Sequence, residues 1–178
     1  GEGRSDSLAR QPAGHQRAAR LVDLAGVSVS DARVQVAGAK SLVQRGPVLV
    51  THWGLSGPAI LKLSAWGARE LWSRDYTFDL LVDWIPALGP DAIADGIALA
   101  RKEHPRKHVV TGPSLELPKR LWDCLVAAAD IPADRIWTEL TRVETRSLIA
   151  QLRESRFAVS GKSLNKDEFV TCGGVPLP

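Results

Sequence analysis

Two hydrophobic periods alternate along this chain, and their order constrains the fold more than any other feature of the sequence. Residues 33–36 alternate polar and apolar side chains, and residues 48–50 and 80–82 are short apolar runs; both patterns are typical of β-strands. Residues 90–155 carry apolar side chains at helical spacing, and strand patterns return after residue 156. The sequence therefore predicts an α+β fold, in which both ends of the chain build one antiparallel β-subdomain around an inserted helical subdomain.

The same patterns divide the chain into four segments. Residues 1–20 have no apolar period, so we expect a flexible leader or the remnant of a preceding domain. Residues 21–89 are predicted to form the first part of the β-subdomain with one helix, and residues 90–155 the helical subdomain. Residues 156–178 are expected to supply the return strands.

Turn and cap residues predict where the first strands and the first helix begin and end. The Gly46-Pro47 pair is predicted to turn the chain between two strands. Ser56 can cap a helix by accepting a hydrogen bond from a free backbone N–H, and Pro58 fits the first helical turn. This helix is expected to run to about Trp72. In the helical subdomain, the residues expected to share one core are Leu121, Leu125, Leu148, Ile149 and Leu152.

Charge and composition argue against some partners. The chain has 23 basic and 20 acidic residues, a net charge of +3. We expect neither a nucleic-acid nor a membrane partner, because both require a concentrated basic face. No apolar stretch is long enough to cross a bilayer. The cysteines Cys124 and Cys172 are expected to be free thiols of a reducing compartment, the cytoplasm by default, with an organelle left open.

Both ends of the sequence suggest a piece of a longer protein. The chain contains no methionine, begins at Gly1 and ends at Pro178 without a helix cap, so we expect both ends to be cuts. It also lacks the glycine-rich turns that hold the phosphates of nucleotides. His104 and His108 have the spacing of a helical metal pair, but Pro105 lies between them, so solvent-facing histidines are expected and no metal site is predicted.

The segment from 48 to 58 is the strongest candidate for a site. A buried strand leads into a glycine-containing turn and a helix start, which places His52, the Ser56 hydroxyl and free amides in one small volume. Such a place can bind an anionic or electron-rich group. The alternative is that His52 and Trp53 only pack the turn. A nucleophile elbow is disfavoured because Pro58 replaces the last glycine of the G-x-S-x-G pattern.

Two motifs carry a resemblance to a known family. Residues 46–61 read GPVLVTHWGLSGPAIL and residues 167–175 read DEFVTCGGV. Together with like residues from Leu21 onward, they are similar to signatures of the aminoacetone-oxidase-like flavoproteins, a family of FAD-dependent oxidoreductases. In that family a region of this kind, with a β-barrel-like part and a helical part, interrupts a two-part FAD-binding domain.

The resemblance implies a function and a set of site residues. The chain would shape the substrate side of the flavin, with the FAD-binding domain of the same parent chain as its partner and a small molecule as substrate. His52 would donate a proton or orient the substrate. The residues expected to face the flavin are Thr51, Gly54, Ser56, Gly57, Thr171, Gly173 and Gly174. By itself the chain is expected to be folded, colourless and inactive, with no FAD bound.

Two other functions compete with this one. The chain could be a free-standing module that binds a protein partner through its helical block. A nucleic-acid binder that uses the arginines of the first 20 residues ranks lowest, because basic and aromatic residues do not interleave there.

Overall fold

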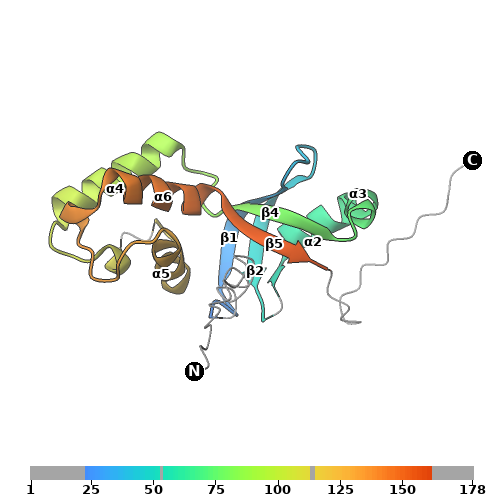
Figure 1. The fold of residues 1–178 in the computed structure, drawn as a ribbon, viewed down its shortest axis with the longest axis horizontal. Coiled ribbons are helices and arrows are strands. Elements are labelled where there is room, and N and C mark those ends of the chain that lie inside the picture. The colour runs from blue at the N-terminus through green and yellow to red at the C-terminus, as the bar shows by residue number, and fades with distance from the viewer. Residues whose placement is uncertain (1–22, 53, 113–114, 162–178) are drawn as a thin grey trace, which may run out of the picture.

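The computed structural model describes residues 23–52, 54–112 and 115–161, which form a curled sheet with a helical subdomain at one end (Figure 1). The strands are β1 (Ser28–Val36), β2 (Val43–Val50), β3 (Leu55–Ser56), β4 (Thr77–Asp83) and β5 (Ser155–Ser160). The α-helices are α2 (Pro58–Trp66), α3 (Ala68–Ser73), α4 (Pro90–Glu103), α5 (Lys119–Ala128) and α6 (Arg142–Arg153). Two short 3-10 helices are η1 (Val109–Thr111) and η2 (Trp137–Glu139).

The predicted α+β class and the construction of the sheet from both sides of a helical insertion are confirmed. The strand order is β3-β2-β1-β4-β5, and all neighbouring strands are antiparallel. Strand β5 follows the helical subdomain in sequence, yet it pairs with β4, which precedes that subdomain (Figure 1). The predicted strand at 168–172 lies outside the described residues.

The Gly46-Pro47 turn is a wrong prediction, because both residues lie inside β2. The register between β1 and β2 shifts here: Val29 pairs with Val48, and Ala32 pairs with Gly46. Such a bulge leaves ladder positions without a hydrogen bond, so a proline, which has no N–H, can sit inside the strand.

The helix expected to reach Trp72 is interrupted at Gly67, which ends α2 and begins α3. A Cβ atom built on Gly67 would lie 2.9 Å from the Leu63 carbonyl oxygen and 3.2 Å from Leu42 Cδ1. The chain therefore bends where it approaches Leu42 closely. Helix α2 covers β1 and β2 and buries Ala59 and Leu63 against them.

The predicted helical core is confirmed. Leu121, Leu125, Leu148 and Leu152 are each at most 3% exposed, and Ile149 packs against them while partly exposed. Beside this core the rings of Trp122 and Trp137 stack at 6.5 Å. The Trp122 indole N–H also donates to the Val109 carbonyl oxygen at 3.0 Å, which fixes η1 to α5.

The two subdomains join where β4 and β5 meet the helices. The backbone N–H of Trp84 donates to the Leu152 carbonyl oxygen at 2.9 Å, and its indole N–H donates to Ser155 Oγ at 2.9 Å. Asp83 is buried and lies 3.3 Å from Arg153 and 3.7 Å from Arg33. Burial raises the pKa of the Asp83 carboxyl, while the Ile85 N–H and then the two arginines partly offset this.

We predict that Leu125→Ala lowers the free energy of unfolding by about 2–5 kcal/mol, because it leaves a cavity in a closed core. Chemical denaturation followed by circular dichroism measures this. Lys119→Ala is the control, since Lys119 on the same helix is exposed and pairs only with Asp123 at the surface. An equal effect of the two substitutions would contradict the assigned buried face.

Asp83 predicts a particular pH dependence of stability. The folded-state pKa is raised above the ordinary value of 3.8, so the contribution of Asp83 to stability is greatest below that value and falls as pH rises through the folded-state pKa. The free energy of unfolding of the wild type minus that of Asp83→Asn should therefore decrease from about pH 4 to about pH 7. Denaturant titrations at several pH values measure it, with Asp95→Asn, at an exposed position of α4, as the control. A difference that grows with pH would contradict the account.

Candidate functional site

The candidate site is a tight hairpin turn between β2 and β3. Val50 pairs with Leu55, so residues 51–54 close the hairpin. Both the backbone N–H and the hydroxyl of Thr51 donate to the Gly54 carbonyl oxygen, at 2.7 and 3.0 Å. His52 is exposed within this turn. The structure thus places Thr51, His52 and Gly54 in one turn, while Ser56 lies in β3. The predicted cluster of His52 with the Ser56 hydroxyl stays a prediction.

Gly57, rather than Ser56, is the N-cap of α2, and no side chain caps this helix. The predicted role of Ser56 as a cap is wrong, because Ser56 lies in β3 and pairs with Leu49. Gly57 has φ +99°, and a Cβ atom there would lie 2.9 Å from the Pro47 carbonyl oxygen. The absence of a side chain at Gly57 is therefore explained by the close approach of the β2 backbone.

Gly54 differs from Gly57 in its surroundings. It has φ +151°, and no atom lies within 4 Å of a Cβ atom built on it. A glycine with open space beside it lets a flat ring approach the backbone closely. The backbone at Gly54 is therefore open to close approach by another group, whereas Gly57 is packed against β2.

The lead-in segment, residues 23–27, links this turn to the helical subdomain. Strands β2 and β4 run in the same direction, but Leu49 pairs with Ser28 whereas Asp83 pairs with Arg33, so β2 extends beyond the end of β4. The lead-in segment lies against the end of β2, because the Gly26 N–H donates to the Val50 carbonyl oxygen at 2.8 Å. Arg120 of α5 donates to the carbonyl oxygens of Asp23 and Ala25, which connects this segment to the helices.

The second predicted motif is not described. Thr171, Gly173 and Gly174 lie outside the described residues, so their expected place beside His52 stays a prediction. Strand β5 ends at Ser160, opposite Thr77, at the end of the sheet away from the His52 turn.

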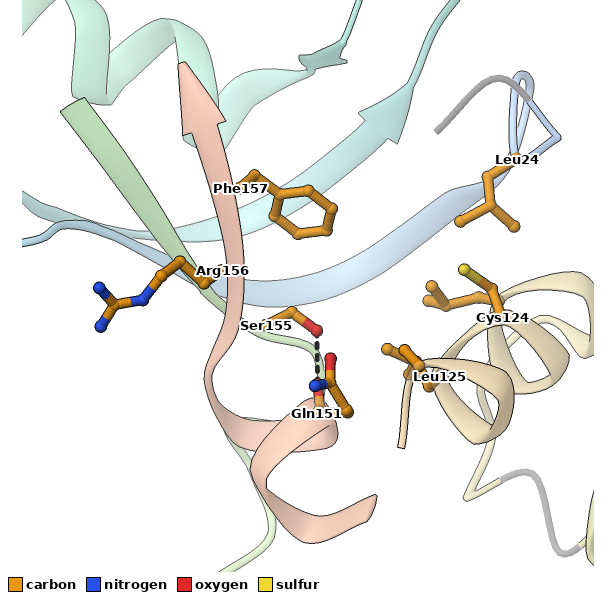
Figure 2. Close-up of a pocket in the computed structure, with 9 residues that line it drawn as sticks. Leu24, Cys124, Leu125, Gln151, Ser155, Arg156 and Phe157 are labelled. Atoms are coloured by element: carbon orange, nitrogen blue, oxygen red, sulfur yellow. Dashed lines mark hydrogen bonds between the residues drawn. The ribbon is translucent and has the colours of Figure 1, made fainter. Parts of the chain in front are cut away.

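A small cavity lies where the two subdomains meet (Figure 2). Leu24 of the lead-in segment, Cys124 and Leu125 of α5, and Phe157 of β5 surround it. Its volume is about 20 Å³, which is room for one water-sized molecule. We interpret it as a packing gap at the junction, too small for an organic substrate.

The two histidines with metal-like spacing lie on either side of a loop. His104 ends α4 and His108 precedes η1. Among the described residues, no three His, Cys, Asp or Glu side chains lie close enough to share a metal ion. In the same part of the chain, each helix is too short or too polar to traverse a lipid bilayer.

Sequence reasoning missed a basic depression on the helical subdomain. Arg106, Lys107, His108 and Thr111 line an open hollow of about 430 Å³. A count of charge over the whole chain hides it, whereas the local run RKEHPRKH at residues 101–108 would have revealed it.

These features define a class of protein: a curled β-subdomain with an exposed hairpin turn, joined to a helical subdomain. The chain matches the family model described as "HI0933-like protein barrel and H2TH domain" over residues 15–170, and it belongs to the HI0933-like family.

A curated relative extends the comparison. The "Ribosomal RNA dihydrouridine synthase" of Escherichia coli (strain K12) is 29% identical over 153 residues, which cover 85% of this chain and 34% of the relative. The chain thus spans about a third of the length of this relative.

We predict that Gly57→Ala destabilises the protein by roughly 1–3 kcal/mol, because φ is positive and the new Cβ would meet the β2 backbone. Thermal unfolding measures the effect. Gly54→Ala tests the dihedral strain alone, since its Cβ would meet nothing, and should cost less. Gly96→Ala in the middle of α4 is the control and should be neutral or stabilising. A neutral Gly57→Ala would contradict the packing explanation.

Proposed function

We propose that this chain is the substrate-side part of a longer FAD-dependent oxidoreductase, and that His52 acts on the substrate. The family match over most of the chain carries the proposal. The exposed turn at His52 and the open approach beside Gly54 support it. No dinucleotide cradle is present among the described residues, so the FAD-binding domain of the same longer chain would hold the cofactor.

The relative favours a particular substrate chemistry. By its name it forms dihydrouridine in ribosomal RNA, which means that it adds hydrogen across a ring double bond conjugated to a carbonyl group. We propose the same reaction class here, reduction of a conjugated carbonyl compound, rather than oxidation of an amine such as aminoacetone. FAD in its two-electron-reduced form would, when bound, supply a hydride equivalent for the carbon farther from the carbonyl group, and an external two-electron donor would have to reduce the flavin again.

The chain's own residues would supply the second hydrogen. His52 would give a proton to the carbon next to the carbonyl group as the hydride is added at the other carbon. Thr51 holds the turn closed through its two bonds to Gly54, and so fixes the backbone on which His52 stands.

A second surface is proposed to receive the FAD-binding domain. Trp66 and Trp72, on α2 and α3, are 81% and 74% exposed, which is unusual for such large apolar side chains. Strand β5 leaves the sheet beside α3, because Ser160 pairs with Thr77, whose N–H donates to the Arg74 carbonyl oxygen at 3.0 Å (Figure 1). The rival proposal, a free-standing interaction module, would use the same surface for another protein.

In the full-length protein, we predict that His52→Ala lowers turnover by about 10²–10⁴-fold, the usual contribution of a general acid. Flavin content, read from the visible absorbance, and thermal stability should change little, because His52 is exposed in the turn. Reduction of an enone or a uracil derivative is the assay.

His104→Ala is the matched control, since it removes an exposed histidine at the end of α4. It should leave turnover unchanged. Normal turnover of His52→Ala, or an equal loss in both variants, would refute the proposed role of His52.

A further inference from the structure

The sequence run 101–108, which includes Arg106, Lys107 and His108 of the basic depression, carries a charge equal to the net charge of the whole chain. Residues 101–108 contain Arg101, Lys102, Arg106 and Lys107 against Glu103, which gives 4 − 1 = +3. The entire chain has a net charge of +3, so the other residues sum to zero. A positive charge this concentrated attracts anions much more strongly than the same charge spread over the surface.

The cations of this run point to solvent and lack acidic partners. Lys102, Arg106 and Lys107 are exposed, as are His104 and His108. None of the three cations takes part in an ion pair with another described residue. Arg101 differs, because it donates hydrogen bonds to the Leu140 carbonyl oxygen and Thr145 Oγ1 and so stabilises the helical subdomain.

The backbone beneath these side chains is held firmly. The Lys107 carbonyl oxygen accepts from the Trp137 N–H at 3.1 Å, and the Pro105 carbonyl oxygen accepts from the Thr138 hydroxyl at 3.0 Å. The Val109 N–H donates to the Arg135 carbonyl oxygen at 2.8 Å. Val109 and Trp137 are fully buried, so the loop is anchored in the helical core. Binding would therefore not have to order the loop backbone.

We propose that this basic depression binds the phosphodiester groups of RNA. Several cations on a fixed loop suit a chain of phosphates, which such contacts position without reading its sequence. This inference rests on the proposed function and deepens it, since it makes the conjugated carbonyl compound a base within RNA.

The test is binding of a fluorescent single-stranded RNA to the 178-residue chain, followed by anisotropy at several salt concentrations. Replacement of Lys102, Arg106 and Lys107 by glutamine should weaken binding roughly 10- to 50-fold near physiological salt. The slope of log affinity against log salt should fall by about 2. Thermal melts establish that the variants are folded.

The matched control replaces three exposed cations of the β-subdomain and its helices, Lys40, Lys62 and Arg69, by glutamine and so changes the net charge equally. It should bind RNA like the wild type. Equal weakening in both triple variants, or none in either, would overturn the proposal. Two other results would also overturn the proposal. If polyglutamate bound as tightly as RNA, the surface would suit an acidic protein partner. If millimolar inorganic phosphate at constant ionic strength abolished RNA binding, the site would be one for free phosphate.

The binding assay is independent of the flavin reaction. RNA binding through the loop, together with a full-length protein that contains no flavin, would refute the proposed function and leave the RNA site standing. If the full-length protein reduced a small enone but the chain did not bind RNA, the RNA site would be refuted and the proposed function would stand.

Discussion

The pairing of β4 with β5 is the constraint on which the rest of the structure depends. The helical subdomain leaves the sheet after Asp83 and returns at Ser155, and these two crossing points are adjacent because Val82 pairs with Ser155. Two hydrogen bonds from Trp84, to Leu152 of α6 and Ser155 of β5, also join the end of β4 to these elements. The helices are thus fixed to the sheet by the pairing of β4 with β5.

The buried carboxylate at the junction makes this arrangement specific at a cost in stability. Burial raises the pKa of Asp83 in spite of two neighbouring arginines, which means that its charge is incompletely compensated. Arg33 belongs to β1 and Arg153 to α6, so the carboxylate joins the sheet and the last helix through one group.

The sequence predicted the architecture well because its strand-like and helix-like segments occupy separate parts of the chain. The helical core from Leu121 to Leu152 follows directly from apolar spacing. Predictions failed where tertiary contact overrides local preference. Pro47 is tolerated in a strand because of a bulge, Gly67 interrupts a helix where it approaches Leu42, and Gly57 replaces Ser56 as the cap because β2 passes so close. No local sequence pattern predicts these close contacts, because each one depends on a residue from another element.

The candidate site was predictable as a turn, and its chemistry came from resemblance to a family. The most direct test of the central claim is the visible absorbance spectrum of the full-length protein that contains this chain, purified without added cofactor. The account predicts a flavin band with close to one FAD per chain, and no band for the 178-residue chain alone. A full-length protein that binds no flavin, or a band of the same stoichiometry in the isolated chain, would contradict it.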